Sequence, residues 1–108
     1  MNILFVKVFS QDHKFFPPKK FMEDLQKCII ENNRYNVLVI PDHTDIRINE
    51  KDKIIIVTVG SKKLKWVPTE DWCIKIKKLL KSQIKRYSEI KNFDIDVIPI
   101  TLKNKENK

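Results

Sequence analysis

The chain has 108 residues, of which 42% are hydrophobic and 33% are charged, and its formal net charge is +8. The hydrophobic fraction is too high for a disordered chain, and no apolar run approaches the roughly 20 residues that a membrane-spanning helix requires. Residues 1–10 lack the charged start and the cleavage site of a signal peptide. We therefore expect a soluble cytoplasmic protein with one domain at residues 1–102 and a disordered basic tail at residues 103–108.

The positive net charge has more than one explanation. The sequence contains one glycine and no alanine, and it is dominated by lysine, isoleucine and asparagine, which AT-rich codons encode. Part of the lysine excess is therefore expected from base composition alone. The total charge is weak ground for nucleic-acid binding, whereas its clustering on one helix face is a better indication.

The first predicted elements are a strand and a helix. Residues 2–9 are β-branched and aromatic, which favours a strand. After a polar loop, Pro17-Pro18 suits the first turn of a helix. We predict this helix over residues 18–33, where Asn32-Asn33 tolerates the left-handed conformation at its end. Its apolar face carries Phe21, Met22, Leu25, Cys28 and Ile29.

Two further strands follow, separated by a polar segment. Residues 35–40 form a strand that Pro41 ends. Residues 42–52 form a predicted polar loop, with a short extended piece at residues 46–48. Residues 53–59 are the most apolar strand of the chain, which is typical of a central position in a sheet.

The longest helical pattern runs from Pro68 to Lys91. Thr69 suits the N-cap, because its hydroxyl can accept a hydrogen bond from an N–H of the first turn. Glu70 and Asp71 then place negative charge at the positive end of the helix dipole. Apolar residues recur in one stripe at about 100° per residue, as in a helix that lies on a core. This stripe consists of Trp72, Cys73, Ile76, Leu79, Leu80, Ile84, Tyr87 and Ile90.

The opposite side of this helix carries positive charge only. Between Ile74 and Arg86 the sequence has six cations and no carboxylate, whereas a solvated helix usually mixes both signs to gain i,i+4 pairs. Ile74 lies among these lysines, where a core cannot use it. The candidate nucleic-acid-binding residues are Lys75, Lys78, Lys81, Lys85 and Arg86.

With a last strand at residues 94–101, the order of elements is that of the split βαβ, or ferredoxin-like, sandwich (βαββαβ). We predict an α+β fold in which two helices cover one face of a four-stranded antiparallel sheet, or a five-stranded one if residues 62–67 add a strand. Pro41 and Pro99 fall in the predicted edge strands, where a missing N–H is tolerated. A parallel flavodoxin-like sheet is the alternative, but the short link between the second and third strands has no room for a crossover helix.

The face of this sheet opposite the helices would be apolar and uncovered. Such patches usually mark interfaces, so we expect a homodimer, or cover by residues 62–67 and the tail. A base-stacking platform is the alternative, since Leu4-Phe5-Val6 resembles the first signature strand of RNA-recognition motifs. Residues 53–59 lack the aromatics and glycines of the second signature. The candidate interface residues are Phe5, Phe9, Ile54, Ile56 and Ile74.

Ionisable residues in two loops are the only indication of catalytic chemistry. Asp12-His13 follows the first strand, and Asp42-His43 and Asp45 follow the second. In the predicted topology both loops leave the same sheet edge, starting about 10 Å apart, and two histidines with three carboxylates suit a divalent metal. The arrangement resembles the small nuclease-like subunits of CRISPR adaptation complexes. These residue types are also common loop formers, so we expect no metal, no cofactor and no catalytic residue.

The sequence argues against other chemistry. A single glycine rules out glycine-rich phosphate loops, and there is no G-x-S-x-G, C-x-x-C or H-E-x-x-H motif. Cys28 and Cys73 both fall on predicted core-facing stripes, so we expect buried, reduced and inert thiols. The alternative for Cys73 is a pKa lowered by its position near a helix N-terminus.

The phrase Val37-Leu38-Val39-Ile40-Pro41-Asp42 and the Lys/Ile/Asn bias resemble small accessory proteins of phages and mobile elements of low-GC bacteria. This resemblance implies an accessory role in a host cytoplasm, either binding nucleic acid or inhibiting a host or defence protein. The sequence therefore predicts a non-enzymatic protein that binds nucleic acid through its basic helix face. The alternatives are a module that binds an acidic protein partner, and a metal-dependent nuclease-like enzyme.

Overall fold

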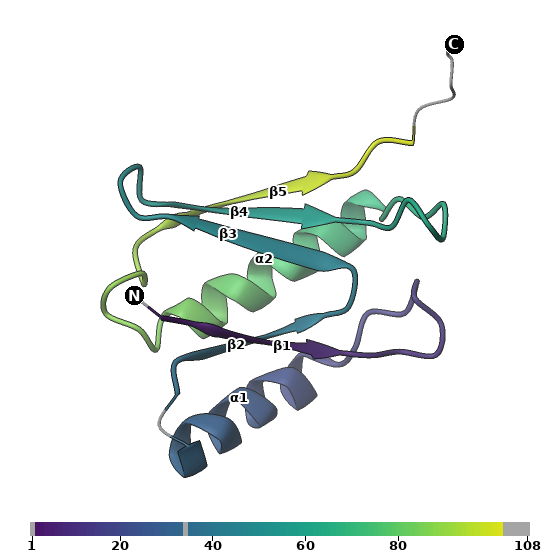
Figure 1. The fold of residues 1–108 in the computed structure, drawn as a ribbon. Coiled ribbons are helices and arrows are strands. Elements are labelled where there is room, and N and C mark those ends of the chain that lie inside the picture. The colour runs from purple at the N-terminus through teal and green to yellow at the C-terminus, as the bar shows by residue number, and fades with distance from the viewer. Residues whose placement is uncertain (1, 34, 103–108) are drawn as a thin grey trace.

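The computed structural model describes residues 2–33 and 35–102, and Figure 1 shows how the chain forms two sheets and two helices. β1 and β2 form a parallel pair, while β3, β4 and β5 form a second sheet in which β3–β4 is antiparallel and β4–β5 is parallel. Within the described residues, no helix is long and apolar enough to cross a membrane. The elements are β1 (Leu4–Val8), α1 (Lys19–Asn33), β2 (Val37–Pro41), β3 (Thr44–Asn49), β4 (Ile54–Val59), α2 (Glu70–Ile84) and β5 (Asp94–Pro99).

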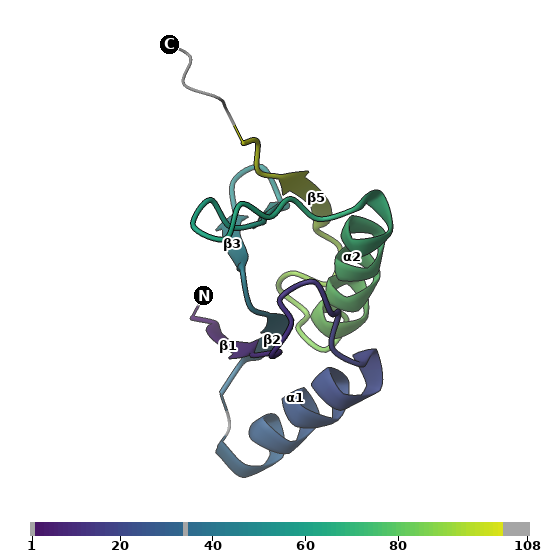
Figure 2. The same cartoon turned by 90° about the vertical axis from the view of Figure 1, so that its right-hand side faces the viewer.

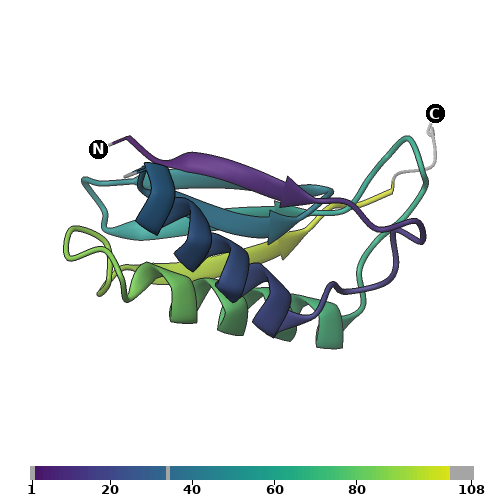
Figure 3. The ribbon, with the colours of Figure 1, turned by 90° about the horizontal axis from the view of Figure 1, so that it is seen from below.

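The two helices cover different parts of the two sheets. α1 packs on the β1–β2 pair, chiefly against β2, whereas α2 packs against both β5 and β2. Figure 2 shows α1 below the β1–β2 pair and α2 beside the second sheet, and Figure 3 shows both helices from below. β2 is therefore enclosed by both helices, and all five of its residues are buried.

β4 has the central position that its sequence predicts, because it pairs with β3 on one edge and with β5 on the other. Ile55, Val57 and Val59 are fully buried and join the core formed with α2. Ile54 and Ile56 alternate with them and lie partly exposed on the opposite face. This alternation follows from the two-residue period of a strand.

α2 begins where the sequence predicts and ends earlier. The Thr69 hydroxyl accepts a hydrogen bond from the Trp72 N–H at 3.2 Å, which confirms the predicted N-cap. The helix ends at Ile84, and turns then carry the chain on to β5. The predicted apolar stripe is buried along the helix and the turns, except for Cys73, which is partly exposed.

The arrangement of the strands differs from the predicted ferredoxin-like sandwich. The α+β class, the two helices and the central apolar strand at residues 53–59 are as expected. Residues 44–49, however, form a full strand instead of a loop with a short extended piece, and residues 62–67 contribute only a bridge between Ser61 and Trp66. β1 also pairs directly with β2, so no strand lies between them. The expected four-stranded antiparallel sheet is therefore wrong, and the edge of β2 gives the reason.

In the part of the chain that the structure describes, β2 pairs with a strand along one of its edges. The Leu4 N–H donates to the Asn36 carbonyl at 2.8 Å, and alternate residues of a strand direct their backbone groups to the same edge. Even-numbered residues of β2 therefore bond to β1. The backbone groups of Val37, Val39 and Pro41 point to the other edge.

The two strand prolines occupy positions where no N–H is required. Pro41 lies on the edge of β2 that faces away from β1 and has no N–H to satisfy there. In β5, the Ile100 N–H donates to the Val59 carbonyl at 2.9 Å, so the nitrogen of the preceding Pro99 faces the outer edge. The prediction that both prolines lie on strand edges is confirmed, although the sheets themselves differ.

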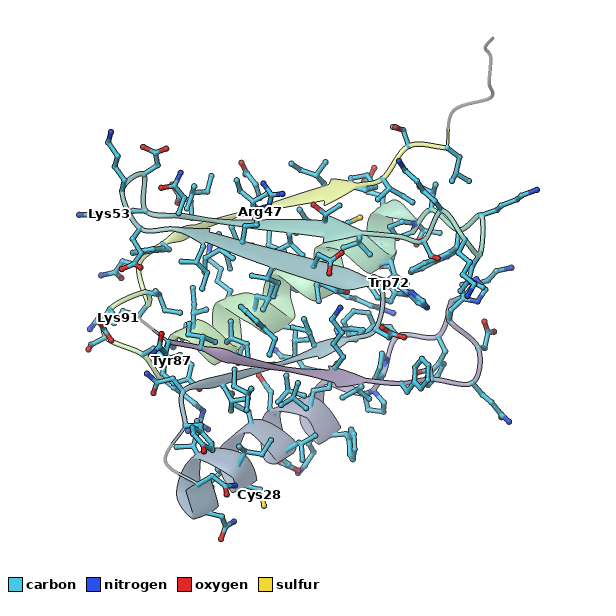
Figure 4. The ribbon with its side chains drawn as sticks, in the orientation of Figure 1. Cys28, Arg47, Lys53, Trp72, Tyr87 and Lys91 are labelled. Atoms are coloured by element: carbon cyan, nitrogen blue, oxygen red, sulfur yellow. The ribbon has the colours of Figure 1, made fainter. Side chains whose placement is uncertain are left out.

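Side chains from both helices hydrogen-bond the second edge of β2. The Val39 N–H donates to Gln83 Oε1 at 2.8 Å, and Gln83 Nε2 donates to the Val39 carbonyl at 2.6 Å. The Tyr87 hydroxyl accepts from the Val37 N–H at 2.8 Å and donates to the Val37 carbonyl. Gln26 of α1 adds a bond from its Nε2 to the same carbonyl at 3.1 Å. Figure 4 marks Tyr87 beside the start of β2.

The spacing of Gln83 and Tyr87 matches the spacing of the strand. One helical turn rises about 5.4 Å, and alternate residues of a strand lie about 6.6 Å apart. Two side chains four positions apart can therefore reach Val39 and Val37, which are two positions apart. Both side chains are buried, so this edge of β2 is closed by α2 and the turn after it, and β3 has no donor or acceptor to pair with there.

Removing the Tyr87 hydroxyl should lower the free energy of unfolding. In Tyr87→Phe, the buried Val37 N–H loses its acceptor, which should cost about 1–3 kcal/mol. Tyr35→Phe removes the same hydroxyl from an exposed tyrosine and is the matched control, with an expected change within about 0.5 kcal/mol. Urea denaturation measures both variants. Equal and small losses would contradict the role given to Tyr87.

Candidate functional site

The exposed side of α2 and of the turn after it carries the predicted cationic residues, all of which are exposed: Lys75, Lys78, Lys81, Lys85 and Arg86. The Lys75 Nζ lies 3.3 Å from a carboxylate oxygen of Asp71, one turn earlier. Within the part of the chain that the structure describes, none of the other four forms an ion pair. In the described part of the chain these four cations are therefore exposed and have no ion-pair partner.

α1 distributes charge differently from α2, although both come from the same lysine-rich sequence. α1 carries three lysines and three carboxylates. Its Lys20 pairs with Asp24 at 2.8 Å, in the usual i,i+4 arrangement. Base composition would add lysine to both helices alike, so it does not explain why residues 75–86 carry cations without any carboxylate.

Ile74 is the apolar exception on this cationic surface. It is 45% exposed and lies one helical turn before Lys78, near the middle of the exposed side. Single exposed apolar residues are common on protein surfaces and need no special explanation. Ile74 nevertheless gives the basic face one apolar contact, which nucleic-acid phosphates would not use.

The other predicted interface residues do not form one patch with Ile74. Phe5 of β1, 38% exposed, and the partly exposed Ile54 and Ile56 of β4 lie on the open side of the sheets. Phe9 is 82% exposed and follows the end of β1. The apolar surface is therefore divided between the open side and the helical side. A homodimer through the open side stays a prediction.

The two loops with ionisable residues do meet, and their histidines contact an aromatic side chain. The ring centroids of His13 and His43 are 6.2 Å apart, and that of Trp66 lies 5.4 Å from His13 and 6.2 Å from His43. The ring centroids of Trp66 and Trp72 are 5.1 Å apart. The result is a cluster of edge-to-face rings where the loops reach the start of α2.

This ring cluster joins the loop after β1 to α2. The Trp72 Nε1 donates to the Lys14 carbonyl at 3.0 Å, and the Phe16 ring lies 4.8 Å from the Trp72 ring. The cavity that His13, His43 and Trp72 line is only about 10 Å³, which is about the space that one water molecule needs. The cluster can therefore hold the loops in place, but it leaves no room for an organic ligand.

The carboxylates proposed for a metal site have other partners. Asp12 Oδ1 accepts from the Lys14 N–H at 3.0 Å, and Asp42 Oδ1 accepts from the His43 N–H at 2.8 Å. Asp45 lies across from Lys7, with 3.3 Å between the Lys7 Nζ and Oδ1. In residues 2–33 and 35–102, no three His, Cys, Asp or Glu side chains are grouped so that they could hold a metal ion.

The two cysteines are less buried than the sequence predicts. Cys28 is exposed and Cys73 is partly exposed, and Figure 4 labels Cys28 on α1 at the lower edge of the molecule. Cys28 lies beside the buried stripe, since Met22 and Gln26 take the inner side of α1. Desolvation raises the pKa of the Cys73 thiol, and the nearby Glu70 carboxylate raises it further. The alternative of a pKa lowered by the helix N-terminus is therefore wrong.

The sequence analysis missed the glutamines that close the edge of β2. Gln83 lies inside the apolar stripe of α2, one turn before Tyr87, and Gln26 takes a similar place in α1. A polar residue in the middle of an apolar stripe is itself a signal, because burying a polar side chain without hydrogen-bond partners costs free energy. That signal shows that a partner is needed without showing where the partner lies.

Comparison with protein-family models, with curated proteins and with solved structures gives no match to this chain. A functional conclusion for this protein therefore depends on its own residues and geometry.

The two thiols should differ in reactivity. The raised pKa of Cys73 lowers its thiolate fraction at any pH below that pKa, and the thiolate is the species that is alkylated. Iodoacetamide at pH 8 should therefore modify Cys28 faster than Cys73. The single-cysteine variants Cys28→Ser and Cys73→Ser, followed by mass spectrometry, separate the two rates. Faster modification of Cys73 would show that its pKa is lowered instead.

Proposed function

We propose that this protein binds nucleic acid through the exposed side of α2, with Lys75, Lys78, Lys81, Lys85 and Arg86 contacting phosphates. The observation that carries the proposal is that residues 75–86, after the Asp71 that pairs with Lys75, carry six cations and no carboxylate, whereas α1 has equal numbers of both signs. Four of the five cations have no ion-pair partner among the described residues, so phosphates would meet them without first breaking an internal pair.

The length of the surface suits several phosphates. From Lys75 to Lys85 a helix rises about 15 Å, at 1.5 Å per residue. One strand of duplex DNA carries about four phosphates over that length, at 3.4 Å per phosphate. Lysine acts as a flexible point charge, so contacts of this kind position the protein on the backbone and do not read the base sequence.

Ile74 supports a second candidate, in which the same surface binds an acidic protein. Ile74 is exposed, with Lys77 and Lys78 one helical turn later, and offers an apolar contact beside positive charge, as protein interfaces often do. This reading also agrees with the accessory role in a host cytoplasm that the resemblance to phage proteins implies. The two candidates differ in how they respond to salt and to the loss of Ile74.

Salt dependence and charge reversal test the nucleic-acid proposal. Five phosphate contacts predict a slope near −4.5 for log K against log[salt] on duplex DNA, at about 0.9 per contact. In Lys78→Glu/Lys85→Glu the slope should become shallower by about 1.8, and affinity should fall at least about tenfold for every sequence tested. Fluorescence anisotropy with duplex and single-stranded oligonucleotides measures both quantities.

The matched control carries the same change of charge on the other helix. Lys19→Glu/Lys27→Glu alters two exposed lysines of α1 and should leave the slope unchanged. If both double variants weaken binding equally, only the net charge matters and α2 is not the site. If wild-type protein binds neither duplex nor single strands at 50–150 mM salt, where phosphate-driven binding should be detectable, the proposal fails. A protein complex that Ile74→Asp abolishes would then favour the second candidate.

A further inference from the structure

Within residues 2–33 and 35–102, one edge of β3 has no backbone hydrogen-bond partner. The Gly60 N–H donates to the His43 carbonyl at 3.0 Å, so odd-numbered residues of β3 direct their backbone groups to β4, because alternate residues of an antiparallel strand face the same edge. The N–H and C=O groups of Thr44, Ile46 and Ile48 therefore point away from β4. Among the described residues, β2 forms no hydrogen bond with these groups. The facing edge of β2 is hydrogen-bonded instead to Gln83 of α2 and to Tyr87 in the turn after it.

A groove runs along this free edge. Its larger part has a volume of about 750 Å³, between Phe5 and Lys7 of β1 on one side and residues of β3 on the other. A smaller part of about 190 Å³ continues past Phe5 and Ile46 to Ile3 and Ile48. All three β3 residues with free backbone groups line one part or the other. The groove therefore presents a strand edge and an apolar wall together.

The groove also contains polar groups with no partner. Arg47 is exposed and forms no ion pair or side-chain hydrogen bond with the described residues. The Thr44 hydroxyl is fully buried and has no partner in the described part of the chain. A Lys7–Asp45 ion pair joins the two walls at 3.3 Å, and Asp45 is largely exposed, so opening this pair should cost little.

We propose that this groove binds an extended segment of another polypeptide, which adds to β3 as a strand. Such a segment would satisfy the free backbone groups of the edge. An acidic side chain on the open side of the segment would meet Arg47, near Phe5, and apolar side chains at alternating positions would meet Ile46 on the other face.

The position of the edge favours a peptide over a second copy of this chain. β3 lies between β4 and the β1–β2 pair, as Figure 1 shows, and β1 forms the opposite wall of the groove. A second folded domain would have to pass β1 to bring one of its own strands alongside β3. A single extended chain, which takes about 4.8 Å beside a strand, would have to open the Lys7–Asp45 ion pair between the two walls but would not have to bring a folded domain past β1.

Nuclear magnetic resonance of the ¹⁵N-labelled protein tests the proposal with the capped peptide TVEVTVT as probe. The amide resonances of Thr44, Ile46 and Ile48 should shift during titration, and these amides should exchange more slowly. A version of the peptide with N-methylated backbone amides keeps the side chains but cannot donate to the edge, so its binding should be lost. No shift at these three amides with about 2 mM peptide, where even millimolar affinity is visible, would overturn the proposal.

A charge exchange tests the role of Arg47 separately. The peptide TVKVTVT should bind wild-type protein up to about tenfold more weakly, since a repulsion replaces an attraction. Arg47→Glu should reverse this preference, while Lys27→Glu on α1 should leave it unchanged. Equal binding of both peptides to both proteins would remove Arg47 from the site. Shifts of the β3 amides that depend on protein concentration without peptide would show that a second copy occupies the edge and would overturn the proposal.

Discussion

The pairing between the outer edge of β2 and the side chains of Gln83 and Tyr87 determines the rest of this fold. A buried N–H or C=O without a partner costs about 1–3 kcal/mol, so the buried edge at Val37 and Val39 requires partners. Four hydrogen bonds from two side chains supply them. Since Pro41 has no N–H, nothing further is needed at the end of the strand. β2 therefore needs no second neighbouring strand, and the sheet divides between β2 and β3.

The same contacts give the protein two unlike surfaces. Gln83 and Tyr87 fix the rotation of α2, since their side of the helix must face β2. The lysines on the other side of α2 are then turned towards solvent as a group. The division of the sheet leaves β3 with one free edge, and the β1–β2 pair becomes the far wall of a groove along it. A basic helix surface and a strand-edge groove thus follow from one arrangement of side chains on opposite sides of the molecule.

Local sequence patterns predicted the helices and strands better than they predicted which strands pair with each other. The apolar stripe and the N-cap of α2 depend on residues only a few positions apart, so the sequence predicts them directly. The positions of Pro41 and Pro99 likewise identified strand edges. β3 was missed in part because His43, at φ 63°, makes the turn before it, whereas left-handed turns are usually recognised by glycine or asparagine. The edge contacts join residues 44 and 50 positions apart, and no local pattern encodes such a pairing. For the candidate site, the cations could be predicted from the sequence, while the groove depends on the strand order and could not.

Amide hydrogen exchange at Val39 in Gln83→Leu tests this arrangement most directly. Val39 bonds to Gln83, whereas Leu38 directs its N–H to β1, so Leu38 is an internal control in the same strand. The Val39 amide should exchange at least about fivefold faster relative to Leu38 than in the wild type, as expected for the loss of a hydrogen bond worth about 1 kcal/mol. Equal changes at both amides would show that Gln83 gives the Val39 N–H no particular protection, and would contradict the account of a sheet divided by α2.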